Sequence, residues 1–106
     1  MRVLFVCSQN RLRSPTAEQV FASYPGVEVA SAGTNRNADH PLTAELVDWA
    51  DLIFVMQKAH QEKLWSRFRA HLDGKRVICL QIGDVYEFMD PDLVTLLQKV
   101  VPPYLR

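Results

Sequence analysis

Two adjoining segments determine the fold: Val3-Leu4-Phe5-Val6-Cys7, and then Ser8-Gln9-Asn10-Arg11-Leu12-Arg13-Ser14-Pro15. Five consecutive apolar residues bounded by polar ones are typical of a strand that is buried on both faces. Ser14-Pro15 predicts a helix start, with the serine as N-cap and the proline at the first helical position. The two segments therefore predict a buried strand that passes through a short polar loop into a helix.

The rest of the chain continues this alternation of apolar runs and amphipathic segments. Apolar residues between Ala17 and Tyr24 recur at the spacing of one helix face, and Pro25-Gly26 ends that helix. Further strands are predicted at residues 27–30, 52–56 and 77–80, a polar loop at 31–41, and further helices over 42–50, 64–72 and 91–101. This order predicts one doubly wound α/β domain over residues 1–106, with a four-stranded parallel sheet of order 2-1-3-4 and helices on both faces.

Composition limits the classes of function. The chain has 106 residues, with 12 Lys and Arg against 12 Asp and Glu, so its net charge is zero. A protein without a positive excess is a poor candidate for binding nucleic acid or an anionic membrane. The apolar runs are far shorter than the roughly 20 residues of a membrane span, and the apolar run near the N-terminus is too short for a signal peptide. With only two cysteines, far apart in sequence, we expect a cytoplasmic protein that is a monomer by default.

The loop after the first strand carries the residue types of an anion site. Such loops occur at the carboxyl end of a strand near the switch point of the sheet, where ligands bind. Backbone amides that lead into a helix converge on an anion, and the guanidinium of Arg13 can bind two oxygens of a phosphate. The same positive field favours the thiolate of Cys7. A thiolate that faces a bound phosphate can attack phosphorus and form a phosphocysteine.

In these residues the chain resembles the low-molecular-weight protein tyrosine phosphatase family, whose signature is a cysteine, five residues, an arginine and then serine or threonine. The resemblance covers most of the chain and is closest to the short prokaryotic branch. It implies Cys7 as nucleophile, a hydrolase without cofactor, and a phosphorylated protein or small phosphomonoester as substrate. No metal is expected, because His40, His60 and His71 do not have the spacing of metal ligands. The resemblance also implies that Asn10, Ser14 and Ser31 support the loop. The phosphate-binding residues would be Ser8, Gln9, Asn10, Arg11, Leu12, Arg13 and Ser14.

The family mechanism needs an aspartate as general acid, and two residues compete for this role. Asp90-Pro91 has the family's Asp-Pro dipeptide, but this pair also fits the start of the last helix. Asp84 lacks the proline, yet Tyr86 follows two residues later at the expected distance from the helix. Because a capping carboxylate is already bound to backbone amides, we expect Asp84 to be the acid, with Asp90 as the alternative.

Several features keep other functions open. Gln9 stands where the family commonly has glycine, Asp84 is not followed by the proline of the family's Asp-Pro pair, and the segment after the second strand is short. These departures favour, as an alternative, a non-catalytic or slow phosphate-binding regulatory module. Arsenate reduction is less favoured because it needs further cysteines and Cys79 is expected in the core. Arg11, expected at the rim of the loop, disfavours a cationic phosphoarginine substrate.

Overall fold

The computed structural model describes residues 1–105, whose strands form one parallel sheet of order β2-β1-β3-β4. The strands are β1 (Arg2–Cys7), β2 (Glu28–Gly33), β3 (Leu52–Val55) and β4 (Arg76–Cys79). The predicted α/β class and strand order are confirmed. β1 and β3 are the inner strands, as their continuous apolar sequences indicated.

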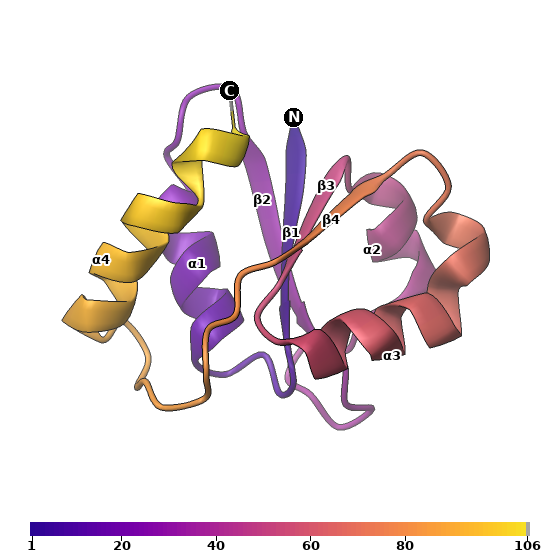
Figure 1. The fold of residues 1–106 in the computed structure, drawn as a ribbon, viewed down its shortest axis with the longest axis horizontal. Coiled ribbons are helices and arrows are strands. Elements are labelled where there is room, and N and C mark those ends of the chain that lie inside the picture. Colours follow the sequence, from indigo (N-terminus) through magenta and orange to yellow (C-terminus); the bar gives the residue numbers. More distant parts are fainter. Residues whose placement is uncertain (106) are drawn as a thin grey trace.

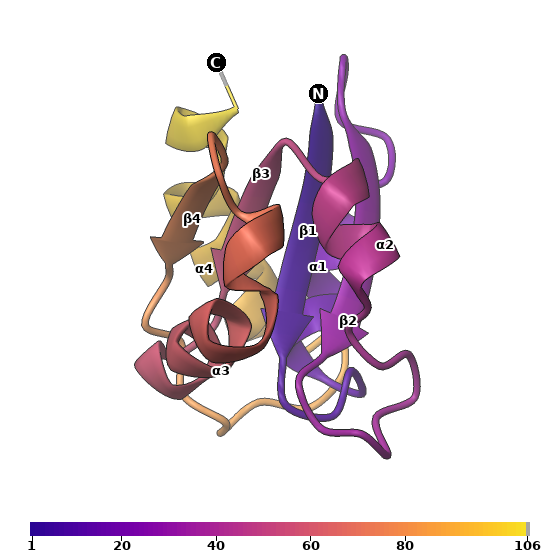
Figure 2. The ribbon, with the colours of Figure 1, turned by 90° about the vertical axis from the view of Figure 1, so that its right-hand side faces the viewer.

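Helices cover both faces of the sheet (Figures 1 and 2). One face carries α1 (Arg13–Phe21) and α4 (Pro91–Val100), and the other carries α2 (Ala44–Trp49) and α3 (Lys58–Phe68). Short 3-10 turns follow at Arg69–His71 and Pro102–Tyr104. Alternate residues of β1 enter the two cores: Phe5 packs on the α1 and α4 side, and Leu4 packs on the other.

Phe5 is the centre of the core below α1 and α4. Its ring stacks on Phe21 of α1 and Phe54 of β3, with centroid separations of 5.8 and 5.3 Å. Burial of each such side chain contributes on the order of 2 kcal/mol to stability. This packing holds the strand that ends at Cys7 against the helix that begins at Arg13, so the loop between them has fixed ends.

β2 is longer than predicted and extends into the segment expected to be a loop. It runs over Glu28–Gly33 instead of residues 27–30, and its last pair joins Gly33 to Cys7. The prediction failed because Ser31 is polar, yet this serine is buried and its hydroxyl is hydrogen-bonded. The extension brings β2 alongside the whole length of β1, up to residues 8–12, the anion loop, which connects β1 to α1.

The start of α1 also differs from the prediction. Leu12 is the N-cap, and Ser14 lies inside the first turn. The hydroxyl of Ser14 is not available for capping because it contacts Cys7 and Asn10 instead. The predicted cap of α4 is confirmed: Asp90 accepts a hydrogen bond from the backbone N–H of Asp92 at 2.9 Å, with proline at the first helical position.

The outer strand β4 is only partly covered. Residues 77–79 are partly buried, so Cys79, expected in the core, packs against the edge of the core on the α2 and α3 side. Trp65 of α3 is exposed.

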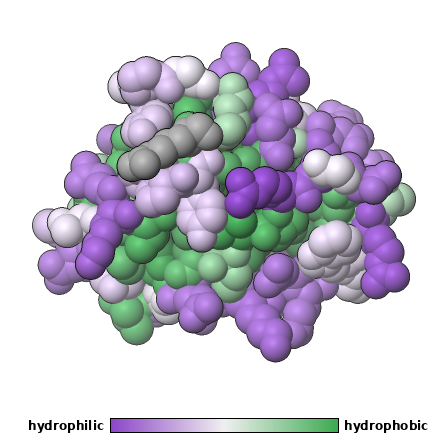
Figure 3. Space-filling model, turned by 45° about the horizontal axis from the view of Figure 1, so that its top comes forward, coloured by the Kyte–Doolittle hydropathy of each residue, from purple (hydrophilic) through white to green (hydrophobic). Residues whose placement is uncertain are grey.

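Figure 3 shows hydrophobic residues gathered in a band across one face of the molecule, with hydrophilic residues around it. Within residues 1–105, no helix has the length and apolar character of a membrane span.

Candidate active site

Cys7 ends β1 at the carboxyl edge of the sheet, between β2 and β3. Its side chain is buried, with 3% of its surface exposed, at the floor of a cavity of about 210 Å³. The residues that line the cavity are Cys7, Ser8, Gln9, Arg11, Leu12, Arg13 and Asp84. The structure thus brings together the expected nucleophile, the expected arginine and Asp84.

Two of the expected phosphate-binding residues lie behind the loop instead of in the cavity. Asn10 and Ser14 are buried, and neither lines the cavity. The side-chain Nδ2 of Asn10 donates to the hydroxyls of Ser14 and Ser31, each at 2.9 Å. Asn10 has a φ of +57°, a left-handed conformation that asparagine tolerates better than most residues. This side chain therefore ties the loop to both α1 and β2.

The bracing network ends at the sulfur of Cys7. Ser14 Oγ lies 3.0 Å from Cys7 Sγ and accepts a hydrogen bond from Asn10. With one side of the oxygen occupied by the asparagine donor, the hydroxyl proton of Ser14 has two acceptors within reach, the sulfur of Cys7 at 3.0 Å and the carbonyl oxygen of Ala32 at 3.4 Å. A hydrogen bond donated to sulfur stabilises a thiolate relative to a thiol. At the other end, Ser31 Oγ donates to Glu18 Oε1.

The guanidinium of Arg13 is buried, with 3% of its side chain exposed, and is fixed by two other loops. Its Nη1 donates to Gln57 Oε1 and to the carbonyl oxygen of Ile82, each at 2.7 Å. Nη1 carries two hydrogens, so these two acceptors occupy it fully and leave Nε and Nη2 for an anion. Arg13 also opens α1, whose first turn has no acidic residue, so the helix dipole adds to the positive potential.

The two candidate acids occupy different places. Asp84 lines the cavity, its side chain is 63% exposed, and its Oδ1 lies 3.7 Å from Arg13 Nε. Asp90 caps α4 and does not line the cavity. Asp84 is therefore the carboxylate within reach of a ligand over Cys7.

The segment after β2 holds the anion loop from outside. Backbone amides of Thr34, Asn35 and Asp39 donate to the carbonyl oxygens of residues 7, 8 and 9, at 2.8 to 3.0 Å. Because the loop carbonyls are bound on this side, the loop amides are free to face an anion. Gly33 permits this close approach, since a Cβ there would lie 2.6 Å from the carbonyl oxygen of Ser8.

Sequence reasoning missed several residues that support the loop. His40 Nδ1 lies 3.0 Å from Asn10 Oδ1, and His60 Nε2 lies 2.8 Å from Ser8 Oγ. The three histidines do not have the sequence spacing of metal ligands. Within residues 1–105, no group of three His, Cys, Asp or Glu side chains could hold a metal ion. A usable signal was the Gln57-x-x-His60 spacing at a helix start, which matches that of a capping box.

Gln9 replaces a glycine that is common in the family, so its side chain could crowd the anion or its backbone could be strained. Its side chain lines the cavity, and the left-handed backbone conformation falls on Asn10 instead. Gln9 Oε1 is buried without a hydrogen-bond partner among residues 1–105. Arg11 also lines the cavity, and its Nε is paired with Asp39 Oδ1 at 3.2 Å near the surface.

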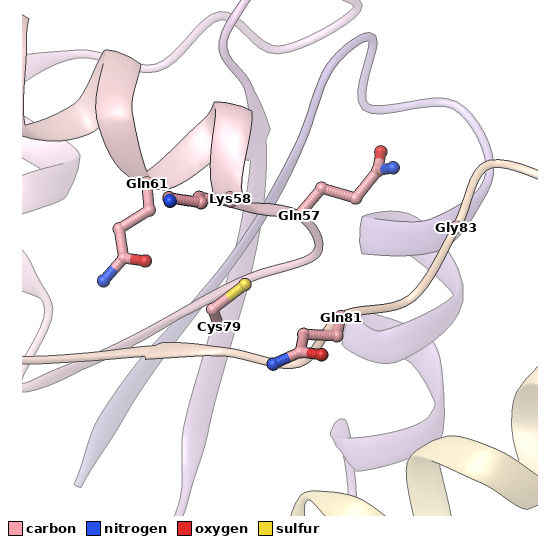
Figure 4. A pocket seen from close by; sticks show the side chains of 6 residues that line it. All are labelled: Gln57, Lys58, Gln61, Cys79, Gln81 and Gly83. Carbon is pink, nitrogen blue, oxygen red and sulfur yellow. The ribbon is translucent and has the colours of Figure 1, made fainter.

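A second hollow, of about 590 Å³, lies beside the first, between the start of α3 and the end of β4 (Figure 4). Cys79 lies at its wall, and Figure 4 shows its sulfur directed into the space between these elements. The side chain of Gln57 is directed away from Cys79, in accord with its hydrogen bond to Arg13. The free thiol of Cys79 is thus outside the cavity of Cys7.

His60 is a buried titratable group beside the site. Burial, and to a smaller extent the charges of Arg13 and Lys63, lower its pKa from 6.5 to about 4, and the charge of Asp84 opposes this shift. The imidazole is therefore neutral in the folded protein near neutral pH.

This lowered pKa of His60 predicts acid sensitivity. Between pH 6.5 and about 4 the unfolded chain binds a proton on His60 that the folded chain does not, so the free energy of unfolding falls as pH is lowered through this window. Urea unfolding across that range measures how the free energy of unfolding changes with pH. The variant His60→Gln is the control, because it retains the contribution of the carboxylates and lacks that of the imidazole. An equal slope in both proteins would contradict this assignment.

Comparisons with known proteins agree with the geometry. The family model described as low molecular weight phosphotyrosine protein phosphatase matches residues 2–46. A protein-arginine-phosphatase of Bacillus subtilis (strain 168) is 30% identical over 118 residues, which cover 82% of this chain and 79% of that protein. The chain belongs to this phosphatase family.

Relatives of this phosphatase carry two different substrate names. A probable low molecular weight protein-tyrosine-phosphatase, EpsP, of Ralstonia nicotianae is 31% identical over 110 residues, which cover 81% of this chain and 73% of that protein. The crystal structure of a YwlE mutant from Bacillus subtilis has a TM-score of 0.76 at 26% identity, and covers 100% of this chain and 99% of that chain. The resemblance inferred from the loop is confirmed at the level of the family.

Proposed function

We propose that this protein is a phosphomonoester hydrolase that acts through a phosphocysteine, with phosphotyrosine of proteins as its substrate. The observation that carries the proposal is that Cys7, Arg13 and Asp84 line the same cavity. Its size of about 210 Å³ suits a phosphoryl group and the first atoms of its leaving group, and Cys7 lies at its floor.

Each residue has a defined step in this mechanism. The thiolate of Cys7 attacks phosphorus, the bond to the ester oxygen breaks, and the proton of Asp84 passes to the leaving oxygen. Arg13 and the loop amides bind the equatorial oxygens as charge develops on them. In the second step Asp84 takes a proton from water, whose oxygen attacks phosphorus. Phosphate and the free thiolate are released.

Arg11 supports tyrosine over arginine as the phosphorylated residue. The guanidinium of Arg11 is at the rim of the cavity, where the substituent of the phosphate has to pass. A phosphoarginine would bring a second guanidinium to this rim, whereas a phosphotyrosine brings a ring that can stack on a guanidinium. Asp39 balances part of the charge of Arg11, and both side chains are more than half exposed, so we expect a preference and not an absolute block.

A comparison of two phosphopeptides tests this proposal. We expect kcat/KM to be about fivefold or more higher for a phosphotyrosine peptide than for the same peptide with phosphoarginine, since like charges at short range cost on the order of 1 kcal/mol. Arg11→Ala should reduce this ratio, and Arg11→Lys should keep most of it.

Other results would lead to different conclusions. A higher kcat/KM for phosphoarginine would make the protein an arginine phosphatase. Failure to hydrolyse either peptide or an aryl phosphate, with phosphate still bound, would favour the regulatory module.

A further inference from the structure

His60 joins the start of α3 to the anion loop. Its side chain is buried, with 2% of the residue surface exposed. Nδ1 lies 3.1 Å from the backbone nitrogen of Gln57, and Nε2 lies 2.8 Å from Ser8 Oγ. The imidazole therefore lies between a backbone amide and the hydroxyl of Ser8, a residue that lines the cavity of Cys7.

These two contacts determine which imidazole nitrogen carries the proton. The backbone N–H of Gln57 can only donate, so Nδ1 must be the acceptor. The neutral ring then carries its hydrogen on Nε2 and donates it to Ser8 Oγ. Burial and the charges of Arg13 and Lys63, opposed by Asp84, lower the pKa of His60 to about 4, so this form persists through the pH range of an assay.

A donor on one side of a hydroxyl leaves the hydroxyl proton for an acceptor on another side. Ser8 directly follows the nucleophile and lines the cavity with Cys7 and Arg13. We propose that His60 is a positioning residue that orients the Ser8 hydroxyl, so that Ser8 donates its proton to an oxygen of the bound phosphoryl group. This inference rests on the proposed phosphatase activity and adds a side-chain donor to the loop amides.

The start of α3 supports both ends of the loop in this arrangement. Gln57 holds Arg13 through its side chain and His60 through its backbone amide. One short segment thus fixes the guanidinium that binds two oxygens and the hydroxyl proposed to bind the third. A change at His60 should therefore act through Ser8, and it should leave the hydrogen bonds of Arg13 intact.

Two variants of His60 separate positioning from structural support. His60→Asn places an acceptor near the position of Nδ1, which preserves the bond from Gln57 but removes the donor to Ser8. His60→Gln places a donor near the position of Nε2, which preserves the contact with Ser8. We expect His60→Asn and Ser8→Ala each to lower kcat/KM for an aryl phosphate by about tenfold to a hundredfold. His60→Gln should retain most of the activity.

The double variant Ser8→Ala/His60→Asn completes the test. If His60 acts only through the Ser8 hydroxyl, His60→Asn causes no further loss in the Ser8→Ala background. A full additional loss, or activity kept in His60→Asn but lost in His60→Gln, would overturn the proposal in favour of a purely structural histidine. Thermal unfolding of each variant identifies any that is misfolded, and Ser8→Thr, which keeps the hydroxyl, should restore activity.

Binding of inorganic phosphate distinguishes failure of this inference from failure of the proposed function. Calorimetry should show weaker phosphate binding in Ser8→Ala and His60→Asn, and unchanged binding in His60→Gln. This pattern would support the inference even if the wild-type protein hydrolysed no ester. Equal affinity for phosphate in the wild-type protein and in these three variants would overturn the inference, whatever their turnover. His71→Ala, a histidine that contacts Asp48 far from the cavity, is the matched control.

Discussion

Replacing Cys7 by serine is expected to abolish turnover, with kcat lowered by about 10⁴-fold or more. The hydroxyl of serine is a weak nucleophile without a base to remove its proton. The charged groups around residue 7 are arranged to stabilise an anion that a thiol forms far more readily. Phosphate binding should persist, because Arg13 keeps its bonds to Gln57 and Ile82 and the loop amides are unchanged.

The second cysteine offers a matched control for this variant. Cys79→Ser makes the same change of atom in a partly buried thiol that lies outside the cavity of Cys7. Steady-state hydrolysis of an aryl phosphate, with calorimetry of phosphate binding, should show loss of turnover only in Cys7→Ser. Residual activity in Cys7→Ser, or loss in Cys79→Ser, would contradict a phosphocysteine at residue 7.

The parts of this molecule that the sequence predicts are those set by contiguous residues. The run from Val3 to Cys7 had no polar residue, so the strand had to be buried on both faces, and the sheet confirms this. The loop from Cys7 to Arg13 is also contiguous, and its short length places the thiol and the guanidinium at one cavity. Local sequence was sufficient for both.

The missed features depend on the register between distant segments. Ser31 belongs to a strand only because β2 pairs with β1 up to Gly33, and its polar side chain gave the opposite indication. His60 and Gln57 reach the loop because β3 is the neighbour of β1, which places the start of α3 beside Ser8 and Arg13. No spacing within a single segment contains this information.

The second large effect concerns the general acid. Asp84→Asn should lower kcat for a phosphotyrosine peptide by about a hundredfold or more, because the leaving oxygen then departs without a proton. The loss should be smaller for para-nitrophenyl phosphate, whose leaving group needs less protonation. Asp84 is exposed and its ion pair with Arg13 is long, at 3.7 Å, so the substitution should change stability little.

Asp90→Asn is the matched control because asparagine caps a helix about as well as aspartate. It should preserve both activity and stability, whereas Asp90→Ala should lower the free energy of unfolding by about 1 kcal/mol through loss of the bond from Asp92. Activity lost in Asp90→Asn with the fold intact would move the acid to Asp90. That result would require the side chain of Asp90 to leave its capping position at the N-terminal end of α4 and reach the cavity. The hydrogen bond from Asp92 to Asp90 opposes this movement. If neither substitution changes the dependence on leaving group, neither Asp84 nor Asp90 is the general acid.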